Sequence, residues 1–203
     1  MSILMPSFNR YPKEADLIGR MLAGYGELEF ALAHCVSMIA GDPDAVFKAM
    51  FRVRGETNRV KIADALARGS LQTGAYRTAF ETMIAGMYEC LSIRNQYAHC
   101  NWLDAPSTGL MFVNLEEVAA KNAEIDLTKL SQFQAPLSML QEQYAFFIHV
   151  AHCIDWLNYE IRFRDGRLKQ NHVPKPKRMD APALHGSPYQ PIPLGNIGKR
   201  KRT

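Results

Sequence analysis

Three polar residues near the middle of the chain have types and a spacing that suit chemistry on a phosphate. Arg94, Asn95 and His99 lie within the segment Ser92–Trp102. Histidine exchanges protons near neutral pH, whereas arginine stays charged and its planar fork matches phosphate oxygens. On a helix Asn95 and His99 lie one above the other, while Arg94 and His99 are about 140° apart around the axis. We therefore expect Arg94 either to curl towards His99 or to meet it across a partner helix.

The spacing of apolar residues predicts a helical body that positions this segment. Apolar side chains recur at steps of three and four residues, the spacing of a helix with one buried face. We expect long helices over Lys13–Ala40, from Gly74 into Tyr97–His99 and over Phe133–Arg164, and short helices over Ala45–Arg54 and Arg59–Arg68. The turn residues Asp104–Gly109 and the apolar run Leu110–Val113 predict a small β-hairpin insertion near 103–117. The predicted fold class is all-α, a helical bundle of three long and about two short helices.

Charge divides the chain into a body, residues 1–165, and a tail, residues 166–203. The tail holds nine of the 24 basic residues, one of the 20 acidic residues and six of the eleven prolines. We expect the tail to be extended or disordered, and the mildly acidic body to have no broad basic face. The tail is either a flexible solubilising segment or an arm that binds nucleic acid or a partner. Its candidate contacts are Lys175, Lys177, Arg178, Lys199, Arg200, Lys201 and Arg202.

The motif Arg94-Asn95-x-x-Ala98-His99 resembles the signature of the HEPN superfamily. The acidic pattern Gly26-Glu27-Leu28-Glu29-x-x-Leu32 in the first long helix is similar to that of many bacterial members. The resemblance covers the helix order over about residues 13–160, and at the level of residues it covers the motif. It implies a helical bundle that forms a homodimer, with two Arg-His motifs facing each other across a two-fold axis.

Active members of this superfamily are metal-independent endoribonucleases. The resemblance then implies that His99 is the general acid or base on the ribose 2′-hydroxyl and the leaving 5′-oxygen. Arg94 would neutralise the charged phosphorane, and Asn95 would hold the phosphate or orient the histidine. Glu29 is a candidate acidic partner of Arg94 or His99, with an exposed helix-face glutamate as the alternative and Glu27 as a competitor. The resemblance suggests a role in toxin, defence or RNA-processing systems, with RNA or a protein such as an antitoxin as partner.

The chain departs from the family pattern after the histidine. Many toxin-type members have a tyrosine two residues after it, and this chain has Asn101 at that position. Many superfamily members also bind nucleotides or proteins without cleaving them. The alternative is therefore a non-catalytic, dimeric helical interaction module with a basic tail that binds a partner or nucleic acid. A third interpretation makes His99 a buried structural histidine in an unrelated bundle.

Other chemistry finds little support in the sequence. Nucleotide-binding glycine loops, the nucleophilic-serine elbow and the zinc-protease helix are missing. Three His-Cys pairs, at 34–35, 99–100 and 152–153, and His149 could offer zinc ligands, but neighbours on a helix point about 100° apart. We therefore expect no metal and no cofactor. Widely spaced cysteines, no leader peptide and no apolar stretch of about 20 residues predict a cytoplasmic protein without a membrane span.

Overall fold

The computed structural model describes residues 5–71, 75–105, 109–121, 126 and 130–184. Among these residues the helices are α1 (Pro6–Arg10), α2 (Pro12–Ala40), α3 (Pro43–Phe51), α4 (Glu56–Arg68), α5 (Ala75–Ala98), α6 (Leu115–Lys121) and α7 (Leu137–Arg164). The strands are β1 (Cys100–Ala105), β2 (Gly109–Asn114) and β3 (Phe133–Gln134). The mostly helical class with a hairpin is confirmed. None of the described helices is long and apolar enough to span a membrane.

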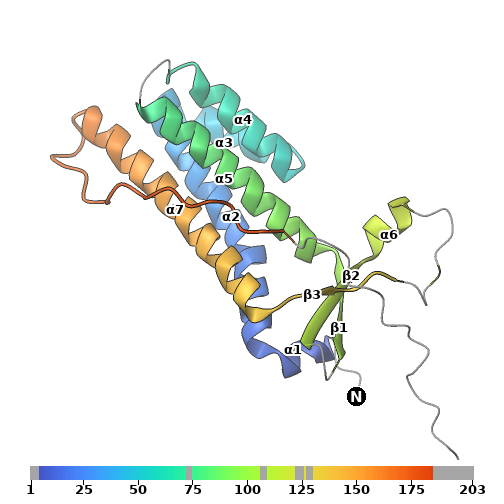
Figure 1. The fold of residues 1–203 in the computed structure, drawn as a ribbon. Helices are drawn as coiled ribbons and strands as arrows, with labels where there is room; N and C mark the ends of the chain where they lie inside the picture. Colours follow the sequence, from blue (N-terminus) through green and yellow to red (C-terminus); the bar gives the residue numbers. More distant parts are fainter. Residues whose placement is uncertain (1–4, 72–74, 106–108, 122–125, 127–129, 185–203) are drawn as a thin grey trace, which may run out of the picture.

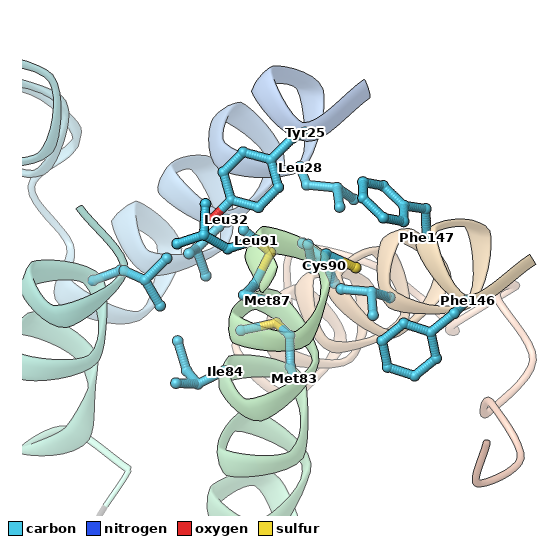
Figure 2. Close-up of a cluster of buried hydrophobic side chains, with 14 of the residues drawn as sticks. Tyr25, Leu28, Leu32, Met83, Ile84, Met87, Cys90, Leu91, Phe146 and Phe147 are labelled. Carbon is cyan, nitrogen blue, oxygen red and sulfur yellow. The ribbon is translucent and has the colours of Figure 1, made fainter. Parts of the chain in front are cut away.

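The three long helices α2, α5 and α7 form the centre of the bundle, and α3 and α4 pack beside α2 and α5 (Figure 1). Figure 2 shows apolar side chains of all three long helices meeting in one core, among them Tyr25 of α2, Met87 of α5 and Phe147 of α7. The buried positions of α2 recur every three or four residues, as the sequence predicts: Ile18, Met21, Tyr25, Leu28, Leu32, Cys35 and Val36. Burial of this face is the main force that holds the helix in place.

A small antiparallel sheet closes the end of the bundle where α5 finishes. Its strand order is β1-β2-β3, with Trp102 paired to Phe112 and Phe112 paired to Phe133. The predicted hairpin is present, but β1 begins three residues earlier than 103, and turn residues 106–108 lie outside the described part. The prediction that the last helix begins at Phe133 is wrong. This residue lies in β3, and α7 begins only after Pro136, whose ring fits just before a helix but not inside one.

The first part of the tail lies against the body. Residues 166–184 run back along α7, in the opposite direction (Figure 1). Asn171 donates a hydrogen bond to the Trp156 carbonyl, the His152 ring lies 2.9 Å from the Pro174 carbonyl, and Gln143 donates to the Ala183 carbonyl at 3.2 Å. Residues 166–170 make the turns that reverse the chain after α7, and residues 171–184 contain no helix or strand and have hydrogen-bond partners on α7. Residues 185–203 lie outside the described part of the chain.

Close approach of α5 and α7 at one glycine gives a test of the packing. A Cβ at Gly86 would lie 2.8 Å from Cγ2 of Val150, whereas a Cβ at Gly24 of α2 would meet no atom within 4 Å. We expect Gly86→Ala to lower the free energy of unfolding by about 1–3 kcal/mol through overpacking. Gly24→Ala should raise it by about 0.5–1 kcal/mol because alanine favours helix. Urea unfolding measures both, and equal effects of the two variants would contradict this packing.

Candidate functional site

The Arg94–His99 segment lies at the junction of α5 and the small sheet. Arg94 and Asn95 lie near the C-terminal end of α5, and His99 lies in the turn between α5 and β1. The side chain of His99 is 53% exposed, and that of Arg94 is 26% exposed. Asn95 is also exposed. The interpretation of His99 as a buried histidine is therefore wrong, and all three side chains are accessible to a ligand.

Aromatic rings hold this junction in place. Tyr97 lies between Arg94 and His99 in the sequence, and its side chain is buried. Its ring stacks on Trp102 of β1, with the ring centroids 5.8 Å apart. Its hydroxyl donates a 2.5 Å hydrogen bond to the Gln143 side chain of α7. Burial raises the pKa of Tyr97 above its usual value, so this hydroxyl remains a proton donor at neutral pH. The end of α5 is thus anchored to the sheet and to α7, and this anchor places the exposed polar residues on either side of it.

Arg94 has two partners in the structure. Its Nη1 donates a 3.0 Å hydrogen bond to Oδ1 of Asn95, and its Nη2 lies 3.6 Å from a carboxylate oxygen of Glu56. Glu56 is the first residue of α4, and it follows Gly55, whose φ of 87° is in the left-handed region that glycine favours. The turn before α4 therefore brings an acidic side chain to the arginine from a distant part of the sequence.

The hydrogen-bond partner of Glu29 is Arg59, and the charge of Arg94 acts on Glu29 without a direct contact. Glu29 is buried, and its Oε2 accepts a 2.8 Å hydrogen bond from Nη1 of Arg59 on α4. Burial raises the pKa of Glu29, and the bond from Arg59 opposes that rise. Glu29 is thus a structural link between α2 and α4, and the carboxylate nearest Arg94 belongs to Glu56 instead. Glu27, the competitor, is exposed on α2.

His99 has its own acidic neighbour. Its Nδ1 lies 3.6 Å from a carboxylate oxygen of Glu116, near the start of α6. In the described part of the chain no hydrogen bond uses Nε2 of His99, so this nitrogen is open to a substrate. Glu116 is thus the acidic side chain beside the imidazole, at a distance longer than a direct hydrogen bond. The structure therefore gives each of the two ionisable motif residues a separate carboxylate, Glu56 for Arg94 and Glu116 for His99.

The described cysteines and the histidines other than His99 have partners within the fold. Among the described residues, no group of three or more His, Cys, Asp and Glu side chains is placed to hold a metal ion. Burial raises the pKa of Cys35 to about 12 and of Cys153 to about 11, so both thiols stay protonated and poor as ligands or nucleophiles. His34 lies 2.9 Å from the Asn158 side-chain amide. Cys35 is buried and Cys153 is partly buried, as is usual for cysteines packed in a helical core.

The candidate basic residues of the tail are described in part. The Lys175 ammonium lies over the Trp156 ring at 5.5 Å, and Lys177 and Arg178 line a shallow hollow with His149 and His152 of α7. The second cluster, Lys199, Arg200, Lys201 and Arg202, lies outside the described residues. The first cluster is thus held near α7, a position that its sequence alone does not indicate.

Comparison with known proteins adds no relative: no family model, no curated protein and no solved structure matches this chain. The chemistry of the site is therefore argued from its own geometry. It combines an exposed imidazole with a carboxylate neighbour, an accessible guanidinium held by an amide and a second carboxylate, and a rigid aromatic anchor between them. These are the groups that proton transfer and phosphate binding require.

The buried position of Glu29 predicts a pH dependence of stability. Because its pKa is raised in the folded chain, the folded state binds this proton more tightly than the unfolded state does. The contribution of Glu29 is therefore most favourable at low pH and is lost as the pH rises from the usual glutamate pKa through the raised one. The free energy of unfolding of Glu29→Gln should show no such fall, because glutamine does not titrate.

Urea unfolding of wild type and Glu29→Gln at several values between about pH 4 and pH 7 measures this difference. Glu27→Gln is the matched control, because Glu27 is an exposed glutamate on the same helix. It should keep the pH dependence of the wild type. An identical pH dependence in Glu29→Gln and wild type would contradict the burial of an ionising group at this position.

Proposed function

We propose that this chain is a metal-independent endoribonuclease of HEPN-like type, with Arg94, Asn95 and His99 as its site. One observation carries the proposal: His99 is exposed beside Glu116, at the same helix end where Arg94 and Asn95 face solvent. A histidine with only a structural role would be expected inside the bundle. The exposed group instead has one ring nitrogen beside a carboxylate and the other open to a ligand.

In the proposed reaction the nucleophile is part of the substrate, so no metal is needed to generate it. His99 removes the proton of the ribose 2′-hydroxyl, and the 2′-oxygen forms a bond to the adjacent phosphorus. The bond from phosphorus to the 5′-oxygen then breaks, and the imidazolium returns its proton to that leaving oxygen. The products are a 2′,3′-cyclic phosphate and a free 5′-hydroxyl. Glu116 supports the charged imidazole formed after the first proton transfer.

Arg94 neutralises the negative charge that accumulates on the phosphorane oxygens. The hydrogen bond to Asn95 fixes its guanidinium, so Asn95 acts as a positioning residue for the arginine. Glu56 is 3.6 Å from Arg94 and partly exposed, a loose pair that a phosphate could displace. The Arg94–Glu56 pair therefore keeps the arginine in place until a substrate arrives.

The proposed active form is a homodimer. Within one chain no hydrogen bond joins the described side chains of Arg94 and His99, which are directed to carboxylates on different helices. A two-fold arrangement that brings the two α5 ends together would place Arg94 of one subunit near His99 of the other. The competing function is the non-catalytic interaction module, in which the same exposed residues bind a partner and the basic tail contributes affinity.

Cleavage of RNA in EDTA tests this proposal. Wild-type protein should cleave mixed cellular RNA without a metal. Loss of the proton-transfer group in His99→Ala should reduce the rate by about 10²–10⁴-fold. Arg94→Ala should also lose activity, through poorer stabilisation of the transition state. His172→Ala, which removes an exposed histidine of the tail, is the matched control and should remain active.

Circular dichroism of each variant establishes that the fold is kept. Absence of cleavage by folded wild-type protein would reject the nuclease and favour the interaction module. Equal rates for wild type and His99→Ala would show that the activity, if present, does not come from this site.

A further inference from the structure

The mildly acidic body contains one segment of opposite charge. Residues 46–61, which cover most of α3 and the start of α4, hold five basic residues and a single acidic one, Glu56. Aromatic and basic side chains alternate there, in Phe47-Lys48 and again in Phe51-Arg52. The net charge of the body conceals this local concentration of positive charge.

Three phenylalanine rings form an exposed cluster on this segment and the neighbouring α2. Phe30 of α2 is 56% exposed and Phe51 of α3 is 40% exposed. The Phe47 ring meets Phe30 edge-on at 5.7 Å and stacks against Phe51 at 5.9 Å. Lys48 and Arg52 complete the lining of a shallow hollow around these rings. Exposed aromatic rings in contact with one another are costly in water, and they indicate a binding surface.

The cations beside the rings are available to a ligand. The side chain of Arg52, which lines the hollow, and that of Arg54, two residues later, are both exposed. Neither side chain forms a hydrogen bond or an ion pair with another described residue. Lys48 has a 2.6 Å ion pair with Asp44, but both side chains are more than half exposed, so this pair is weak. The hollow therefore offers exposed ring surface, most of it on Phe30, with the positive charges of Lys48 and Arg52 at its edge.

One residue holds this surface and connects it with the candidate site. The Arg59 guanidinium lies over the Phe51 ring at 5.5 Å, its Nε donates to the Val53 carbonyl at 3.4 Å and its Nη1 donates to Glu29. Arg59 lies one helical turn after Glu56, the carboxylate beside Arg94. The same short helix thus carries both the partner of Arg94 and the support of Phe51.

We propose that the Phe30–Phe47–Phe51 hollow binds single-stranded RNA, with bases stacked on the exposed rings and phosphates held by Arg52 and Arg54. The choice of RNA over DNA rests on the proposed function. Stacking on aromatic rings needs bases whose faces are free, which a single strand has and a duplex lacks. A second copy of the chain is a poorer occupant, because a two-fold contact here would bring unpaired arginines of like charge together.

Fluorescence anisotropy with the full chain tests this surface. The protein carries His99→Ala so that RNA is not consumed, and the probes are a labelled oligouridylate and an RNA duplex of equal length. Adding Phe51→Leu, which keeps an apolar side chain but removes the ring, should weaken binding of the single strand by about fivefold or more. Adding Arg52→Gln should lower the slope of log affinity against log salt by about one. Both changes should affect the duplex less.

Phe163→Leu is the matched control, because Phe163 is an exposed ring on α7. It should leave the affinity for the single strand unchanged. Equal affinities of the Phe51→Leu and Phe163→Leu proteins, or no binding of the single strand, would overturn the proposal. Sedimentation is measured in parallel: an altered oligomeric state with unchanged RNA affinity would assign the hollow to a second copy and also overturn it.

The binding and cleavage measurements test the hollow and the proposed nuclease separately. If wild-type protein cleaves RNA but Phe51→Leu does not weaken binding, the hollow fails and the proposed function stands. If Phe51→Leu weakens binding of the single strand while wild type cleaves nothing, the hollow stands and the proposed function fails.

Discussion

The buried ion pair between Glu29 and Arg59 is the interaction on which both candidate surfaces depend. It joins α2 to α4 at 2.8 Å, and the carboxylate is almost wholly removed from water. The guanidinium and its hydrogen bond offset part of the hydration that the carboxylate loses, and burial still raises the pKa of Glu29. Through this pair α4 is fixed against the long first helix, and α4 in turn carries Glu56 to Arg94.

This arrangement places the two surfaces in a defined relation. In the first turn of α4, Glu56 lies beside Arg94, which is bonded to Asn95 near the end of α5. Three residues later on the same face of α4, the Arg59 guanidinium lies over the ring of Phe51, and its Nε donates to the Val53 carbonyl. The first turn of α4 therefore contacts both the proposed RNA-binding hollow and the proposed catalytic site. Binding and cleavage would then be separate tasks of neighbouring residues, which explains how an acidic body could act on a polyanion.

Much of the helical framework could be predicted, because the period of buried residues in α2, α5 and α7 is set by local sequence. The motif could also be located, because Arg94, Asn95 and His99 lie close together in the sequence. Its carboxylate partners could not be predicted, because Glu56 and Glu116 reach Arg94 and His99 from elements whose relative positions depend on tertiary packing. The sequence pattern suggested Glu29 as the partner of Arg94 or His99, but Glu29 is buried and bonded to Arg59. The aromatic hollow was missed because net charge was averaged over the whole body.

The proposed mechanism uses the 2′-hydroxyl of the RNA as the nucleophile, and RNA that lacks this group is the most direct test. Wild-type protein is given, in EDTA, a labelled oligoribonucleotide and the same sequence with 2′-deoxy sugars at every position. If the 2′-hydroxyl is the nucleophile, the protein should cleave the first strand to products with 2′,3′-cyclic phosphate ends and should leave the second intact. Cleavage of the deoxy strand, or products with a 3′-hydroxyl, would require an external nucleophile and would rule out this mechanism.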